Sequence, residues 1–155
     1  MSTSIENYVP YAPNAQGFTE ALIDLKSSMG TSSVFKVTGY EAIAFENVSQ
    51  GQILYSRASD GQVGKAIASD TLDKAIVAGV AETTKTAGQS LKVITAGIVA
   101  TSGLNTGDQY FLSASSAGSI VETPPSSAGQ YVTRVGEAGS TGQFIVNAER
   151  PILLS

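Results

Sequence analysis

Carboxylates, lysines, arginines and tyrosines are the ionisable side chains this chain offers for chemistry, because its 155 residues contain no histidine and no cysteine. Histidine is the commonest general base and metal ligand in proteins, and cysteine supplies thiolate nucleophiles and zinc ligands. A nucleophilic triad that uses histidine is therefore excluded, and so are disulfides and thiolate metal sites.

Carboxylates are the remaining candidates for acid–base work: Asp60, Asp70, Asp73, Asp108 and eight glutamates. A pair of carboxylates can hydrolyse glycosides. Such enzymes usually also stack sugars on aromatic rings, and the chain has no tryptophan. Asp60 precedes Gly61 and is interpreted as a turn residue, whereas Asp70 and Asp73 are assigned to a loop. We predict that the protein is not an enzyme and holds no catalytic residue, cofactor or metal.

The segment Gly61–Ala66 superficially resembles a phosphate-binding loop. A true P-loop needs a glycine five residues before Gly64 and a serine or threonine after Lys65. The chain has Ser59 and Ala66 at those positions. The segment is instead predicted to form a hairpin that turns at Asp60–Gly61.

Composition limits the partners that the chain can bind. The formal net charge is −4 and the nine lysines and arginines are scattered, which argues against nucleic-acid binding. No window reaches the length of a membrane span, and the polar first ten residues do not form a secretory signal. Charged residues make up only 14% of the chain. A surface with so few charges indicates either that part of it is covered in an assembly with other chains, or that the protein is a β-protein whose surface is rich in Ser, Thr and Gly.

Residues 1–30 are predicted to form an N-terminal arm followed by one short helix. Pro10 and Pro13 favour an extended backbone, and apolar side chains at i, i+4, i+7 and i+11 give residues 14–29 one apolar face. The helix either covers part of a β-domain or packs against another subunit. Its apolar face and the tyrosines of the arm are the candidate partner or oligomer contacts: Tyr8, Tyr11, Phe18, Leu22 and Leu25.

Residues 31–155 are predicted to form a single β-rich domain, because short apolar runs alternate with Gly, Asn, Asp and Ser turns. This pattern predicts an all-β fold of short antiparallel strands, either a small β-barrel or β-tulip or a sandwich. Glycines also recur at a near-constant offset, from Gly51 to Gly107 (56 residues), Gly79 to Gly136 (57) and Gly88 to Gly142 (54). The echo indicates either one β-unit used twice or a chance alignment of abundant glycines.

Three short motifs recur along the second part of the chain: a Gly-x-Ala strand at Gly79–Ala81, an Ala-Gly-Ile-Val strand at Ala96–Val99 and a late Val-Gly-x-Ala strand at Val135–Ala138. The runs Val48–Tyr55 and Leu104–Phe111 belong to the same pattern. Through these motifs, the chain from about residue 40 to 155 resembles the capsid decoration (cement) and head-fibre proteins of tailed bacteriophages.

The resemblance implies a structural virion protein on the capsid exterior. Such a protein would bind the major capsid protein as a homotrimer and stabilise the shell. The alternative is a receptor-binding or fibre adhesion module, for which Tyr110 and Tyr131 are candidate sugar-contacting aromatics. A small binding domain unrelated to phage also remains open.

Overall fold

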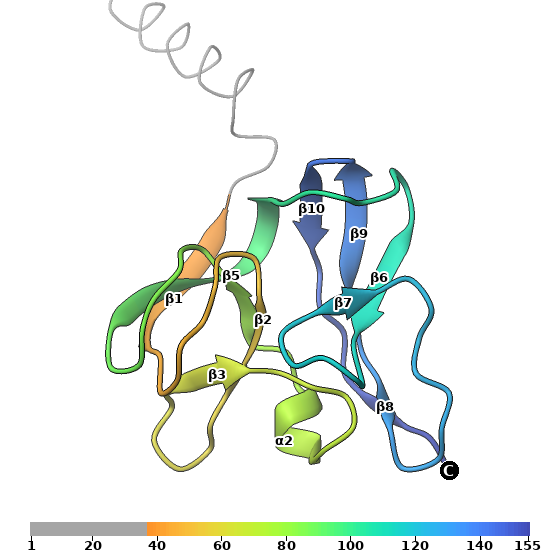
Figure 1. Cartoon of the computed structure of the whole chain (residues 1–155), viewed down its shortest axis with the longest axis horizontal. Coiled ribbons are helices and arrows are strands. Elements are labelled where there is room, and N and C mark those ends of the chain that lie inside the picture. The colour runs from red at the N-terminus through yellow and green to blue at the C-terminus, as the bar shows by residue number, and fades with distance from the viewer. Residues whose placement is uncertain (1–36) are drawn as a thin grey trace, which may run out of the picture. The chain divides into compact units, whose positions relative to one another are not determined.

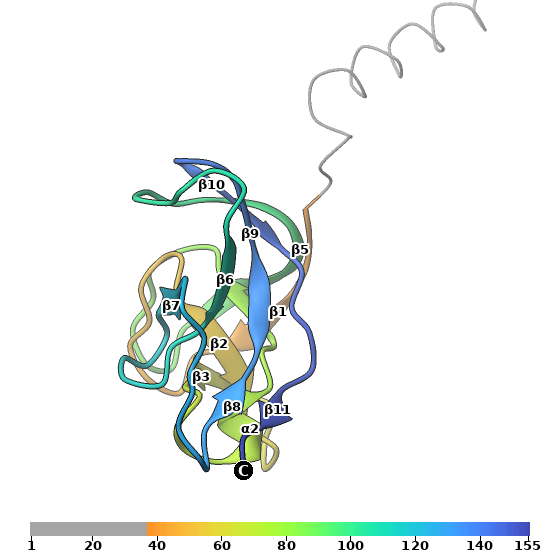
Figure 2. The same ribbon diagram turned by 90° about the vertical axis from the view of Figure 1, so that its right-hand side faces the viewer.

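The computed structural model describes residues 37–155 (Figures 1 and 2). The predicted arm, the predicted helix and their five candidate contact residues lie outside the described residues. The described elements are β1 (Thr38–Ile43), β2 (Ile53–Ser56), β3 (Val63–Lys65), α2 (Leu72–Ala75), β4 (Gly79–Ala81), β5 (Ser90–Ala100), β6 (Gln109–Leu112), β7 (Ile120–Val121), β8 (Tyr131–Val132), β9 (Arg134–Ser140), β10 (Gln143–Val146) and β11 (Ile152–Leu153).

The domain is all-β, as the sequence predicts, and its main sheet curls like part of a small barrel. The strand order is β3-β2-β4-β5-β10-β9-β6-β7, and β1 pairs with β5 in addition. Every pairing between named strands is antiparallel, which suits strands joined by short turns. Strands β8 and β11 form a separate two-stranded sheet.

The main sheet contains the same five-strand unit twice. The first repeat consists of β1 to β4 and the beginning of β5, and the second consists of the end of β5 with β6, β7, β9 and β10. In the first repeat, the hairpin β2–β3 pairs through β2 with β4, and β4 pairs with β5. In the second repeat, the hairpin β6–β7 pairs through β6 with β9, and β9 pairs with β10. Figure 1 shows the two repeats on opposite sides of the domain, with β5 passing between them.

Equivalent residues pair in the same register. Leu54 lies opposite Gly79 in the first repeat, and Tyr110 lies opposite Gly136 in the second. These pairs follow the 56- and 57-residue offsets of the sequence, so the glycine echo is a structural repeat. The pair Gly88 and Gly142 is not equivalent, because Val93 corresponds to Phe144 and the offset has fallen to 51 there.

The apolar runs at 91–94 and 97–100 favour two separate strands, but the structure has one continuous strand of 11 residues, β5. Its first half pairs with β1 and β4, and its second half pairs with β10. Gly97, at the change between the two halves, has a φ of 113°, a conformation that side chains disfavour. Glycine therefore permits a local irregularity in the strand rather than ending it.

The two ends of the first repeat meet. The N–H of Phe45, just after β1, donates to the carbonyl oxygen of Val63 in β3 at 3.0 Å, and Ala44 bridges to Val63. This contact brings the edges of the five strands together around a small core of seven buried residues: Ala44, Val48, Leu54, Val63, Ala81, Leu91 and Val93.

The second repeat has larger side chains at the equivalent core positions. Tyr110 replaces Leu54 and Phe144 replaces Val93, and the two aromatic rings meet edge to face with centroids 6.0 Å apart. They belong to the larger core cluster, which also contains Ile53 and Val80 from the first repeat. That shared apolar core joins the two repeats into one packed domain.

The segment between β3 and β4 differs from the prediction. The apolar run at residues 75–81 favours a strand, and the sequence predicts a loop at Asp73. The structure instead has the single-turn helix α2, with strand β4 starting only at Gly79. The Asp70–Lys74 ion pair at i, i+4 and the fully buried Ala75 favour this turn over an extended chain. No helix in residues 37–155 is long and apolar enough to cross a membrane.

Candidate functional site

The Asp60 carboxylate serves local structure. Asp60 accepts hydrogen bonds from the Arg57 guanidinium and from the N–H of Gln62, which fixes the β2–β3 turn as predicted. The Arg57 hydrogen bond holds the pKa of Asp60 below its usual range. Within residues 37–155, no three Asp or Glu side chains gather where they could hold a metal ion.

The two tyrosines proposed to contact sugars do not lie on loops. Tyr110 is in β6 and is 4% exposed. Its hydroxyl accepts a hydrogen bond from the N–H of Asn105 at 2.9 Å and donates to Glu122 at 3.0 Å. Tyr131 lies in β8 and is half-buried. Tyr110 is therefore a core residue whose polar end is already paired.

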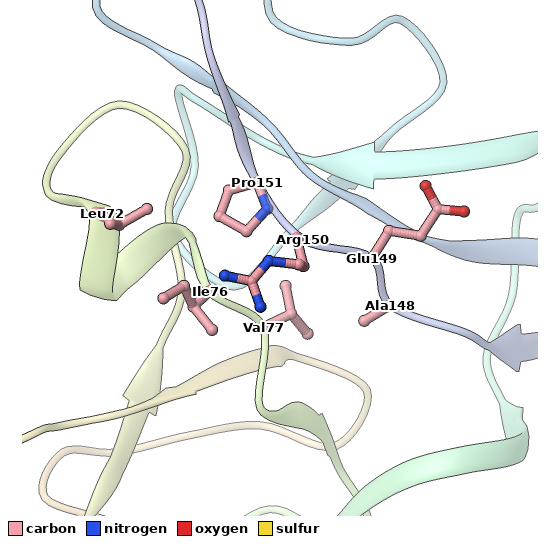
Figure 3. A pocket seen from close by; sticks show the side chains of 7 residues that line it. All are labelled: Leu72, Ile76, Val77, Ala148, Glu149, Arg150 and Pro151. Atoms are coloured by element: carbon pink, nitrogen blue, oxygen red, sulfur yellow. The ribbon is translucent and has the colours of Figure 1, made fainter.

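An apolar groove lies between α2 and the segment that precedes β11. It is a cavity of about 450 Å³, which we call the α2 groove, lined by Leu72, Ile76, Val77, Ala148, Glu149, Arg150 and Pro151 (Figure 3). Leu72 and Ile76 lie at i, i+4, so they are on one side of the helical turn.

The elements that flank this groove carry the most exposed large hydrophobic side chains of the described residues. Leu72 is 49% and Ile76 47% exposed, and Ile152 and Leu153 of β11 are 63% and 58% exposed. Soluble domains rarely gather exposed apolar side chains in one place unless a partner covers them. The α2 groove is therefore the candidate functional site.

Both walls of the groove are held in place by buried or paired groups. Thr133 is fully buried, and its hydroxyl donates to the carbonyl oxygen of Ala75 at 2.9 Å, which fixes the end of α2. Arg134 donates to Gln109 at 3.0 Å and to the carbonyl oxygen of Asn147 at 3.3 Å. The groove is thus preformed, so a partner would not have to order its walls.

The charge of the groove comes from Glu149 and Arg150. Glu149 is paired with Arg134 at 3.4 Å. Arg150 makes no salt bridge within residues 37–155, and Figure 3 shows its side chain pointing towards Ile76. The groove thus presents apolar side chains beside one uncompensated positive charge.

The α2 groove does not follow from local sequence patterns. The signals were present as Leu72 and Ile76 at helical spacing and as the final apolar run Pro151–Leu154. They are 75 or more residues apart in the chain, and only the fold brings them together. In comparisons with known proteins, no protein-family model matches the chain and no curated protein matches its sequence.

Proposed function

We propose that the protein is a non-enzymatic structural subunit of a phage virion. It binds the major capsid protein on the outside of the capsid as a homotrimer and stabilises the shell. The α2 groove is the observation that carries the proposal, because a preformed apolar surface with one free charge is suited to docking. The pattern that resembles decoration proteins supplies the identity of the partner.

The chemistry of the groove defines the segment that it would bind. Leu72, Ile76 and Val77 require apolar side chains opposite them, and burying one such residue contributes about 1.5–3 kcal/mol. Arg150 requires a carboxylate, because a buried unpaired charge is costly. We therefore expect the capsid contact to be a surface segment with two or three apolar residues beside an Asp or Glu.

Stabilisation of the shell follows from mass action. A subunit that binds the assembled shell but not its dissociated parts adds about 2.7 kcal/mol per site when its free concentration is a hundredfold above Kd. A shell repeats its binding sites many times, so a modest affinity at each site gives a large total.

Co-sedimentation with capsids that lack this protein tests the proposal. Ile76→Asp places a charge in the groove and should reduce binding at least tenfold, as should Arg150→Glu. Ile43→Asp is the matched control, because Ile43 is 39% exposed on β1, outside the groove, and it should bind like the unmodified protein. Full binding by both groove variants would refute the groove as the capsid contact.

The same experiment separates the groove from the predicted N-terminal contact. Leu22→Asp tests the helix expected over residues 14–29, and a loss with this variant alone would assign the contact to that segment. Light scattering during size exclusion should give the mass of three subunits. If Ile76→Asp changes this mass, the groove joins copies of the chain and does not dock the capsid.

A further inference from the structure

A second cavity of about 290 Å³ lies on the first repeat and has different chemistry. Polar and aromatic side chains dominate its lining, and we call it the Tyr55 pocket: Phe45, Glu46, Tyr55, Lys65, Asp70 and Lys74. Asp70 and Lys74 lie at i, i+4. Leu72 and Ile76, which line the α2 groove, each lie two residues further along the chain. The two cavities share no lining residue.

The side chain of Tyr55 is buried, and its hydroxyl has no hydrogen-bond partner among the described residues. It is 7% exposed, and its hydroxyl makes no hydrogen bond to any of residues 37–155. Tyr110 is buried to a similar degree, but its hydroxyl has two partners. Because buried polar groups are nearly always paired, the Tyr55 hydroxyl has a hydrogen-bonding position that solvent or a ligand in the pocket can fill.

The internal repeat shows that the fold does not require this hydroxyl. Tyr55 lies opposite Gly64 in the β2–β3 hairpin, and the equivalent pair in the second repeat is Phe111 opposite Val121. A phenylalanine therefore occupies the same strand position in the same domain. The oxygen of Tyr55 is an addition to the repeat rather than part of its packing.

Gly64 makes room for two further lining groups. A Cβ atom at Gly64 would lie 2.3 Å from Cζ of Phe45 and 2.7 Å from Oε2 of Glu46. Without it, Glu46 lies over the strand and accepts a hydrogen bond from the N–H of Lys65 at 2.7 Å. The equivalent position holds Val121, which lines a separate cavity of about 220 Å³ together with Ser113 and Gln130. The two repeats therefore have cavities of different chemistry here, and the Tyr55 pocket is specific to the first.

The charges around the pocket balance. Asp70 pairs with Lys74 at 2.6 Å, and this hydrogen bond raises the pKa of Lys74, which stays protonated. The second carboxylate of the pocket is that of Glu46, and the second ammonium group is that of Lys65. One oxygen of each carboxylate is bound, which leaves the other oxygen of each as an acceptor among the described groups. Two carboxylates, two ammonium groups and a phenol offer several donors and acceptors with no net charge.

We propose that the Tyr55 pocket binds a small, neutral, polyhydroxylated ligand, namely a single sugar ring or the terminal ring of a glycan. Adjacent hydroxyl groups can donate to the free carboxylate oxygens and accept from Lys65, while the phenol of Tyr55 pairs with one of them. The Arg57 guanidinium covers one face of the Phe45 ring, 4.2 Å from its centroid, so the apolar lining for the C–H face of the sugar comes from the rest of Phe45 with Ile67 and Ala117. The volume is at the small end of ligand sites, about 300–1,000 Å³, which limits the occupant to about one ring.

Titration of the full chain with methyl glycosides, followed by amide NMR shifts, tests this proposal. The probes are methyl glycosides of neutral hexoses, of N-acetylhexosamines and of hexuronates. We expect a neutral probe to shift amides around Gly64 and Lys65. Tyr55→Phe should weaken that probe about tenfold without lowering the melting temperature, because Phe111 fills the equivalent position. Tyr40→Phe, on exposed β1, is the matched control and should bind normally.

Three outcomes overturn the proposal: no shift with any glycoside, equal affinity of Tyr55→Phe, or tighter binding of hexuronates than of every neutral probe. The last result would assign the pocket to anions through Lys65. The proposal does not depend on the capsid role. Tyr55→Phe should co-sediment with capsids like the unmodified protein, and Ile76→Asp should still bind the sugar probe.

Discussion

The equivalent glycines Gly79 and Gly136 should tolerate alanine poorly in the two repeats. Each faces a neighbouring strand too closely for a side chain. A Cβ atom at Gly136 would lie 2.0 Å from the carbonyl oxygen of Ile145, and one at Gly79 would lie 2.4 Å from that of Ile94. Both oxygens belong to the backbone of paired strands, so neither can move without disturbing the ladder.

The size of the effect follows from two opposing terms. Replacing a glycine in a strand by alanine should by itself stabilise the fold by about 0.5–1 kcal/mol, because alanine loses less backbone conformational entropy on folding than glycine does. Forcing an extra methyl group into a packed site costs about 1–3 kcal/mol. Gly136→Ala has the shorter contact, so we expect a net loss of about 1–2 kcal/mol. For a domain of this size, that loss lowers Tm by about 4–10 °C.

Thermal and urea unfolding measure this loss. Gly79→Ala should also be destabilising, by somewhat less than Gly136→Ala. Gly142→Ala is the control, because its nearest contact would be 3.6 Å away and its φ is not in the left-handed region. It should melt at or above the temperature of the unmodified protein. Equal melting temperatures for Gly136→Ala and Gly142→Ala would contradict the close approach between β9 and β10.

Three further perturbations have defined outcomes. Thr133→Val leaves the carbonyl oxygen of Ala75 unpaired and should cost about 1–3 kcal/mol in urea unfolding, whereas an unchanged midpoint would contradict the role of this hydrogen bond in fixing α2. Arg57 holds the pKa of Asp60 low, so this pair stabilises the fold above the unfolded pKa of about 3.9 and the contribution is lost as the pH falls through the folded pKa. Asp60→Asn should therefore have a shallower fall of Tm on acidification at low salt, and melting curves that parallel the unmodified protein would refute this reasoning. Tm should be the same with and without EDTA or reductant, since a fall with EDTA would reveal a carboxylate-bound ion.

The sequence was sufficient for the fold class because alternation and turn residues are local signals. The Asp60–Gly61 turn and the strands around Tyr55 and Tyr110 follow from them directly. Helix α2 was missed because Ile76 and Val77 favour strands, while the buried hydrogen bond from Thr133 comes from 58 residues away. Tertiary contacts overrode local propensity in that segment.

The two cavities could not be predicted from the sequence for a similar reason. The α2 groove joins Leu72 to Pro151, and the Tyr55 pocket joins Phe45 to Lys74. The difference between Tyr55 and Tyr110 also needs the structure, because both are buried tyrosines in equivalent hairpins. Only their hydrogen bonds separate a structural tyrosine from a candidate ligand contact.

Strand β5 has a consequence for how the domain opens. It is the last strand of the first repeat and the first strand of the second, so neither repeat can unravel without removing a strand from the other. Local opening of either half therefore costs nearly as much as global unfolding, and the duplicated chain behaves as one cooperative foldon. The amides in the middle of β5 should exchange with solvent only when the whole domain unfolds. Cleavage of the chain within β5 would give two fragments, each with only part of β5 and therefore with an incomplete sheet.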